Sequence, residues 1–211
     1  MMNSSFLEIF AQMAMIIPAF LLALSFHEFA HALTATILGD DTAKKSGRLT
    51  LNPFAHVDPM GLLFLLIFRV GWAKPVPFNY NNFKRPKLYS ILTGLAGPVA
   101  NFILAIVCFI LIRFFPEHFF PMALTKSFIQ ILEATAYINV MLGVFNLLPI
   151  PPLDGSHVIT ALFSARYPQF VFWLYQYSMI ILIFLLFFPV TYRWLALLIN
   201  YVYFFLRALV F

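Results

Sequence analysis

Long apolar stretches separated by short polar connections dominate the pattern of this chain. Each is close to or longer than the roughly 20 residues that a helix needs to cross a bilayer. The pattern therefore predicts an all-α polytopic membrane protein with about five transmembrane helices. The predicted spans are Ala11 to Leu38, Ser90 to Phe115, Lys126 to Leu148, Gln169 to Phe188 and Thr191 to Phe211.

The connection between the first two spans, residues 39–89, is longer and more varied than the others. It includes an apolar piece, Gly61 to Val70, that is too short to cross and is expected to be re-entrant or interfacial. WAKPVPFN (Trp72 to Asn79) follows, and its two prolines exclude a central strand but fit an edge strand or an extended loop. We therefore expect a re-entrant or β-hairpin-like loop here. After the third span, PIPPLDG (Pro149 to Gly155) breaks the helix, and a short amphipathic piece continues to Arg166.

The composition agrees with a membrane protein. Hydrophobic residues make up 63% of the chain and charged residues only 10%, with a mean hydropathy of +0.91. Soluble domains carry about a quarter charged residues, so these few charges could not cover a water-facing surface. Glu8 is the only charge before Ala11, so a cleaved signal peptide is not expected. The lone Cys108 excludes an intrachain disulfide framework and a multi-cysteine zinc site.

The net charge of +5 lies entirely in the region from Asp40 to Ser90, which holds eight basic and three acidic residues. Basic loops between spans tend to remain cytoplasmic, so the first span is expected to run from outside to inside. This predicts a multi-pass protein of the cell (inner or plasma) membrane. Neither a basic helix nor aromatic-basic interleaving suggests a nucleic-acid partner.

HEFAH, in the first predicted span, carries the chemistry. His27 and His31 lie one helical turn apart on one face, where two imidazoles can hold one zinc ion. Glu28 is placed to take a proton from an activated water, as a general base. The alternative is a polar patch satisfied between helices, but ionisable groups in a span are costly without a role. The motif lies 7 to 11 residues before the cytoplasmic end of the span, roughly 10–16 Å deep.

A catalytic zinc site needs a third protein ligand and an open position. Glu117 and His118 are expected on the opposite side of the membrane, whereas Asp154 is expected on the same side as HEFAH. Asp154 is therefore the predicted third ligand, and its alternative role is the N-cap of the helix starting near Gly155. The full set of candidates is Glu8, Asp40, Asp41, His56, Asp58, Cys108, Glu117, His118, Glu133, Asp154 and His157.

Small and amide residues form two stripes at helical spacing. One contains Gly94, Gly97 and Asn101, and the other contains Asn139, Gly143 and Asn146. Such residues let membrane helices approach closely, so helix packing explains most of them. Asn146 precedes the PIPPLDG break by one turn and is a candidate for binding the substrate or the developing oxyanion.

Asn101 and His56 are further candidates for positioning a substrate. His56 and Asp58, in NPFAHVDPMG, are also explained by a solvated or turn-stabilising role.

Together these motifs resemble the site-2 protease family of intramembrane zinc metalloproteases. The resemblance rests on HEFAH, GLAGPVAN and FNLLPIPPLDG, supported by GRLTLNPFAHVDPMG and GWAKPVPFN, over roughly residues 14 to 160. It implies Zn²⁺ bound by His27, His31 and Asp154, with Glu28 as general base and acid. It also implies that Asn146 positions a membrane-embedded substrate helix, and that cleavage often releases a regulatory protein.

The expected organisation is a metalloprotease core over residues 1–165 and additional transmembrane helices over 166–211. It resembles the compact bacterial and archaeal members, and no room for a PDZ or CBS domain is visible in the chain. The lipid bilayer and a membrane-protein substrate are the expected partners, with the active site towards the cytoplasm.

Two alternatives remain open from the sequence. One is a membrane-anchored zincin that cuts soluble loops, although such an enzyme would carry HExxH in a cytosolic domain. The other is a non-proteolytic membrane metal-binding protein, either a transporter or a scaffold. Transporters often show internal repeats, which are not evident here.

Overall fold

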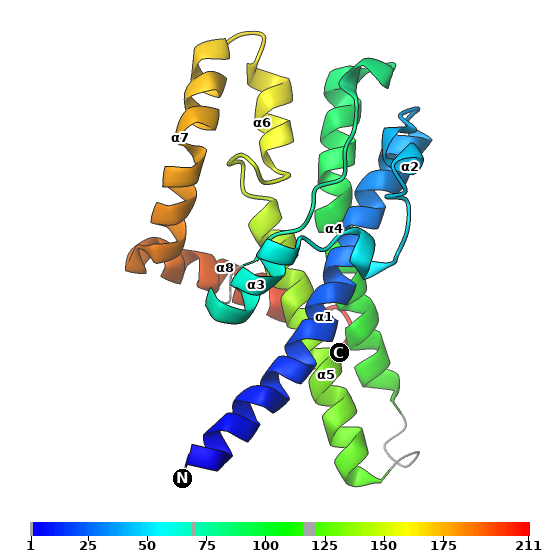
Figure 1. The fold of residues 1–211 in the computed structure, drawn as a ribbon, viewed down its shortest axis with the longest axis vertical. Helices are drawn as coiled ribbons and strands as arrows, with labels where there is room; N and C mark the ends of the chain where they lie inside the picture. The colour runs from blue at the N-terminus through cyan, green and yellow to red at the C-terminus, as the bar shows by residue number, and fades with distance from the viewer. Residues whose placement is uncertain (1, 69–70, 116–120) are drawn as a thin grey trace.

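Figure 1 shows the computed structural model of the chain, in which helices pack around a crossing of three long ones. The structure describes residues 2–68, 71–115 and 121–211, and every regular element in these ranges is helical, which confirms the all-α class. The helices are α1 (Met2–Ile37), α2 (Thr42–Lys45), α3 (Pro59–Phe68), α4 (Pro86–Phe114), α5 (Met122–Asn146), α6 (Ser156–Phe163), α7 (Pro168–Phe187) and α8 (Pro189–Ala208). Two 3-10 turns cover Pro53–Ala55 and Tyr80–Asn82.

Within the described ranges, four helices are long and apolar enough to cross a membrane: Ile16–Ile37 of α1, the whole of α4, Leu124–Asn146 of α5, and α7. The chain is therefore a multi-pass membrane protein. The fifth predicted span, Thr191 to Phe211, forms α8, but α8 is not among these four. Its arginines, asparagine and tyrosines dilute the apolar residues, and Figure 1 shows it lying across the lower end of α7.

Prolines and one glycine mark several helix boundaries. Pro86, Pro168 and Pro189 are the first residues of α4, α7 and α8, where the missing N–H costs no hydrogen bond. After α1, Gly39 adopts a φ of 104°, and the N–H of Asp40 bonds to the Ala35 carbonyl at 2.9 Å. This is a Schellman-type helix end, which favours glycine because a Cβ would be strained there. It places Asp40 directly at the end of α1.

The core lies where α1, α4 and α5 cross. Fully buried alanines allow the close approach expected of membrane helices, among them Ala23 of α1, Ala105 of α4 and Ala136 of α5. α8 covers the same core from outside, with the Tyr203 ring 5.2 Å from that of Phe109. The most extensive helix contact is that between α4 and α5, and α1 packs against both of them.

The long connection after α1 is an irregular layer over the polar end of this core. The expected β-hairpin-like element is reduced to one antiparallel bridge, Val57 with Ala73, and the N–H of Lys74 bonds to the His56 carbonyl at 2.8 Å. Two prolines without N–H groups interrupt the following residues, which explains why pairing stops. Trp72–Asn79 is thus an extended loop, called here the extended segment. The apolar piece before it, which starts at Gly61, belongs to α3 as far as Phe68.

Asp40 fastens the far end of the extended segment to α1. Its carboxylate accepts hydrogen bonds from the Asn79 N–H at 2.6 Å, the Asn82 side chain at 2.7 Å and Thr42. Burial alone would raise the pKa of Asp40, but these hydrogen bonds outweigh it and hold the pKa below its usual value. The ionised carboxylate therefore fits this buried position.

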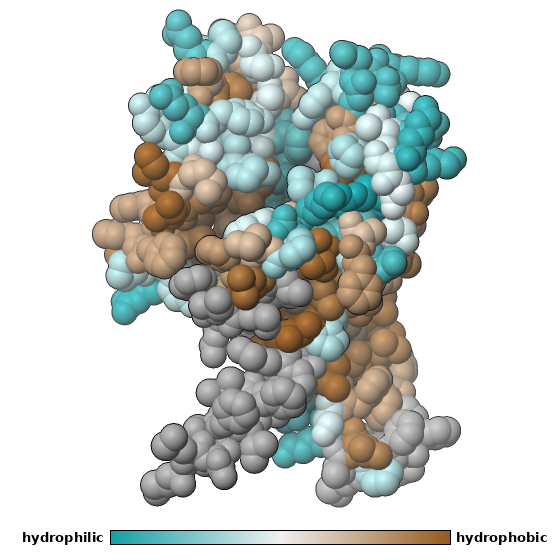
Figure 2. Space-filling view, viewed as in Figure 1, coloured by the Kyte–Doolittle hydropathy of each residue, from teal (hydrophilic) through white to brown (hydrophobic). Residues whose placement is uncertain are grey.

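The polar residues gather at one end of the molecule. Figure 2 shows hydrophilic residues around the end that carries α2, the start of α4 and the α6–α7 turn, with hydrophobic residues across the middle. The exposed basic residues of this end include Lys44, Lys45, Lys84, Arg85, Lys87 and Arg166.

Candidate metal centre

Three side chains from two distant parts of the chain converge where α1, α4 and α5 cross. His27 and His31 project from one face of α1, with their Nε2 atoms 3.0 Å apart. Asp154 lies in the break between α5 and α6, with Oδ2 at 3.0 Å from His27 Nε2 and Oδ1 at 3.3 Å from His31 Nε2. Both histidines are buried, 6% exposed each. The two motifs that the sequence placed in one leaflet therefore meet at a single point.

The hydrogen bonds behind His27 determine which of its nitrogens carries the hydrogen. Asn101 of α4 donates through its amide nitrogen to Ala23 O at 3.1 Å and to Asn139 Oδ1 at 2.8 Å. Its Oδ1 therefore faces His27 Nδ1, at 2.6 Å, and can only accept. His27 consequently donates from Nδ1 and presents a lone pair at Nε2.

His31 is held in the same way by backbone. Its Nδ1 lies 2.6 Å from the carbonyl oxygen of Thr93, which only accepts, so Nδ1 carries the hydrogen. Pro98 lies inside α4, where it removes one helical hydrogen bond and crowds the turn before it. The carbonyl that thereby loses its helical N–H partner is that of Gly94, the residue after Thr93.

With both Nδ1 atoms protonated, the Nε2 atoms of His27 and His31 and the carboxylate of Asp154 face one another as electron-pair donors, with no hydrogen between them. Two Nε2 lone pairs and a carboxylate face one another, with ligand atoms all within 4.8 Å, and Asp154 Oδ2 has no hydrogen-bond partner. Such an arrangement is repulsive unless a proton or a metal cation lies between the donors. Nitrogens bound to a tetrahedral zinc lie roughly 3.3 Å apart, close to the observed distances. The residues present therefore fit a metal ion.

Gly97 of α4 makes room for this cluster. A Cβ at Gly97 would lie 2.7 Å from His27 Nε2, far inside van der Waals contact. The absent side chain therefore lets both imidazoles rest against the helix backbone. The small-residue stripe thus has a specific role at this position, in addition to helix packing.

Asp154 does not cap α6. The N-cap of α6 is Gly155, without a side-chain cap hydrogen bond, and the carboxylate of Asp154 faces the imidazoles instead. The Gly155 N–H bonds to the Asn146 carbonyl at 2.7 Å, which closes the loop that carries Asp154. Burial alone would raise the pKa of Asp154, but positive charge beside it, from a proton on the imidazoles or from a metal ion, holds the pKa below its usual value. The carboxylate is thus available as a negatively charged ligand.

The remaining candidates lie as follows. Glu28 is buried, 7% exposed, immediately beside His27 on α1. The Asn146 amide donates to Leu142 O in its own helix at 3.0 Å, rather than to the cluster. His56 is fully buried rather than solvated, and its Nε2 donates to Thr50 O at 2.8 Å, away from the cluster.

Other acidic candidates have separate partners. Glu133 pairs with Arg207 of α8 at 3.7 Å, and Asp40 binds the loop described above. Asp58 accepts from the N–H groups of Met60 at 2.8 Å and Gly61 at 3.0 Å, which confirms its turn-stabilising role. Glu117 and His118 lie outside the described residues, as does the side chain of Glu8. Asp41 and Cys108 do not join the cluster.

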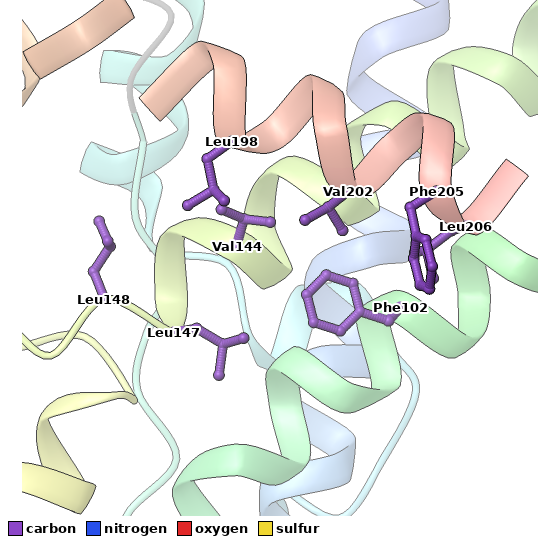
Figure 3. Close-up of a pocket in the computed structure, with 8 residues that line it drawn as sticks. All are labelled: Phe102, Val144, Leu147, Leu148, Leu198, Val202, Phe205 and Leu206. Atoms are coloured by element: carbon purple, nitrogen blue, oxygen red, sulfur yellow. The ribbon is translucent and has the colours of Figure 1, made fainter. Parts of the chain in front are cut away.

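A separate apolar cavity of about 440 Å³ is lined by residues of α4, α5 and α8 and of the turn after α5 (Figure 3). Phe102 of α4 and four residues of α8 reach into it, next to Val144 near the end of α5. It offers no group that could bind a metal or activate water, so the metal centre lies elsewhere. Its lining residues are Phe102, Val144, Leu147, Leu148, Leu198, Val202, Phe205 and Leu206.

The Asn101 network yields a first prediction. Asn101→Leu removes the acceptor that orients His27, and loss of such an outer partner typically lowers metal affinity about 10- to 100-fold. We expect zinc affinity, measured by competition with a chromogenic chelator, to fall by this amount. Asn200→Leu, the same change at an exposed position of α8, is the matched control. Equal affinity in the two variants would contradict the orienting role.

Comparisons with known proteins identify the family of this chain. The model of "Peptidase family M50" matches residues 118–188. A Bacillus subtilis protein named "Putative zinc metalloprotease YwhC" is 42% identical over 149 residues, covering 70% of this chain and 68% of that protein. "Putative zinc metalloprotease Rip2" of Mycolicibacterium smegmatis is 33% identical over 187 residues, covering 85% and 69%. No solved structure gives a significant match. The chain therefore belongs to peptidase family M50, the site-2 protease family.

Several supporting groups were not assigned from the sequence. The Thr93 carbonyl is a main-chain atom, which residue identity does not reveal. The contact of Gly97 with the histidines and the support of Asn101 by Asn139 were interpreted as packing. Their regular spacing along α4 and α5 was the available signal.

Proposed function

We propose that this chain is an intramembrane zinc endopeptidase that hydrolyses peptide bonds of membrane-embedded substrate helices near the cytoplasmic face. In this proposal His27, His31 and Asp154 hold the zinc ion and Glu28 is the general base and acid. The observation that carries it is the convergence of three electron-pair donors, without a hydrogen between them, beside a buried glutamate.

The chemistry divides between the metal and the protein. When bound, zinc supplies a Lewis acid that polarises a carbonyl and lowers the pKa of a water molecule. Glu28 takes a proton from the attacking water and delivers it to the leaving nitrogen, so that one water yields a carboxyl and an amine. Asn101 and Thr93 keep the imidazole lone pairs directed at the site. Asn146, one turn before the loop of Asp154, is the proposed positioning group for the substrate.

The substrate has to be extended at the cleavage point, because the peptide bonds of a helix are shielded. The extended segment offers an edge for such a strand. It is held at Ala73 by the bridge to Val57 and at Asn79 by Asp40. Between these points, within the described ranges, the backbone groups of Val76–Phe78 make no hydrogen bonds. They remain available to a substrate backbone.

The orientation follows from charge. The basic residues gather at the end of the molecule nearest the extended segment, and basic connections tend to remain in the cytoplasm. An active site opening towards that end suits the release of a cytoplasmic regulatory domain from its anchor. Regulated intramembrane proteolysis is therefore the proposed role.

Metal removal tests this function. Purified protein in detergent is expected to cleave a synthetic peptide of about 20 apolar residues. Chelation should abolish the cleavage, and stoichiometric zinc should restore it, as followed by mass spectrometry of the products. Zinc bound without any cleavage would instead support a scaffold. Cleavage that survives complete metal removal would overturn the metalloprotease mechanism.

A further inference from the structure

The face of α4 that holds the two histidines continues towards a third imidazole. Asn101 and Thr93 receive Nδ1 hydrogens from His27 and His31, each at 2.6 Å. One turn before Thr93, the Ser90 hydroxyl lies 3.3 Å from Nδ1 of His157. Three imidazoles thus lie along one helix face, and α4 holds each of them through Nδ1.

Close contacts fix the His157 ring in place. A Cβ on Gly94 would lie 2.7 Å from Cδ2 of His157, so the absent side chain is what lets the ring approach α4. The Tyr80 hydroxyl lies 3.4 Å from the same Nδ1, and the Phe78 ring is centred 5.5 Å from the imidazole. His157 therefore joins α6 to α4 and to the end of the extended segment.

The groups around Nδ1 of His157 differ from those around Nδ1 of His27 and His31, and this difference affects the Nε2 atom of each ring. Two hydroxyls face Nδ1, at 3.4 Å and 3.3 Å, and a hydroxyl can donate or accept. When one of them donates to Nδ1, the ring hydrogen lies on Nε2, for which the structure provides no partner among the described residues. In that tautomer His157 presents a donor, whereas His27 and His31 present lone pairs.

His157 is also close to the metal centre without belonging to it. It begins α6 three residues after Asp154, whose carbonyl accepts its backbone N–H at 3.0 Å. Burial lowers the pKa of His157, while the charge of Asp154 acts to raise it and that of His31 to lower it. The cluster of converging ligand atoms nevertheless consists of His27, His31 and Asp154.

We propose that His157 contacts the substrate, donating a hydrogen bond from Nε2 to a backbone carbonyl of the extended peptide between the extended segment and the metal centre. The proposal rests on the proposed function. In this proposal a substrate strand paired with the extended segment ends beside Phe78 and Tyr80, whose rings contact His157. The substrate then passes His157 before it reaches Asp154. A donor is required there because a peptide carbonyl only accepts.

Two substitutions separate this role from a structural one. The Gln side-chain amide reaches about as far as Nε2, whereas that of Asn reaches only as far as Nδ1. Cleavage of the synthetic apolar peptide in phosphatidylcholine vesicles should show KM raised about tenfold in His157→Asn and nearly unchanged in His157→Gln, as one neutral hydrogen bond predicts. Both should keep wild-type kcat and zinc content. Gly94→Ala, which displaces the ring, should resemble His157→Asn.

A second measurement requires no substrate. In zinc-loaded protein labelled with ¹⁵N-histidine, and assigned by comparison with His157→Gln, the His157 nitrogens should report a hydrogen on Nε2. Removing both hydroxyls, in Ser90→Ala with Tyr80→Phe, should abolish that preference. A hydrogen on Nδ1 in the wild-type protein, or an unchanged KM in His157→Asn, would overturn the proposal.

Failure of the proposed function gives a different result. In that case wild-type protein would bind no zinc or would leave the peptide intact, and the nitrogen spectrum would still decide the tautomer of His157. A zinc-loaded, active wild type with an indifferent His157 would overturn only the substrate contact.

Discussion

Glu28→Gln is expected to abolish peptide hydrolysis while leaving zinc content at the wild-type level. Glutamine has nearly the same shape, so the buried position beside His27 remains filled, but its amide cannot accept a proton from water. Loss of a general base typically costs about 10²- to 10⁴-fold, and here the same group also serves the leaving nitrogen. We expect kcat to fall by at least about a thousandfold, measured as initial rates on a reconstituted apolar peptide.

Glu133→Gln is the matched control for this experiment. Glu133 lies in α5 and pairs with Arg207, about 40% exposed, and it takes no part in the metal centre. Its replacement should leave kcat within about twofold, because partly exposed ion pairs contribute little to stability. Cleavage by Glu28→Gln at the control rate would refute the assignment of the base.

The second large effect is expected at Asp154. Asp154→Ala removes the only carboxylate of the ligand cluster and leaves two neutral imidazoles. We expect zinc affinity to fall by more than the 10- to 100-fold that an outer partner costs. Elemental analysis of detergent-purified protein should therefore find near one zinc per chain in the wild type and little in the variant.

Asp154→Asn and Asp58→Ala complete that test. The asparagine keeps the size of the side chain and should also lose most zinc, which distinguishes a lost ligand from a misfolded loop. Asp58→Ala removes a carboxylate that caps α3 and should retain zinc fully. Full zinc occupancy in both Asp154 variants would show that the cluster does not hold the metal.

Much of this architecture is readable from hydrophobic periodicity. The predicted second span, Ser90 to Phe115, corresponds to α4, and the break at PIPPLDG lies between α5 and α6 as expected. The number of spans stays a prediction. α8 has the length expected of the fifth span but is not among the four helices that are apolar enough to cross, and contacts such as Phe109 with Tyr203 hold it against the core.

For the metal centre, the sequence could predict the groups that belong to particular side chains but not those that belong to the main chain. HEFAH and Asp154 were named from spacing and topology, and the structure brings their ligand atoms together. The Thr93 carbonyl was not, because any residue type supplies the same atom. The role of Asn146 stays a prediction, and its amide nitrogen donates to Leu142 O, one turn earlier in the same helix.

The distribution of the metal centre along the chain has a consequence for biogenesis. The two imidazoles belong to α1, the groups that hold them belong to α4, and the carboxylate follows α5. Membrane insertion from the N-terminus therefore delivers the histidines first, without their hydrogen-bond partners or the third ligand. In the proposed enzyme, a nascent chain would therefore lack its complete ligand set until the segment after α5 has been made. Zinc would then bind only after α1, α4 and α5 have assembled.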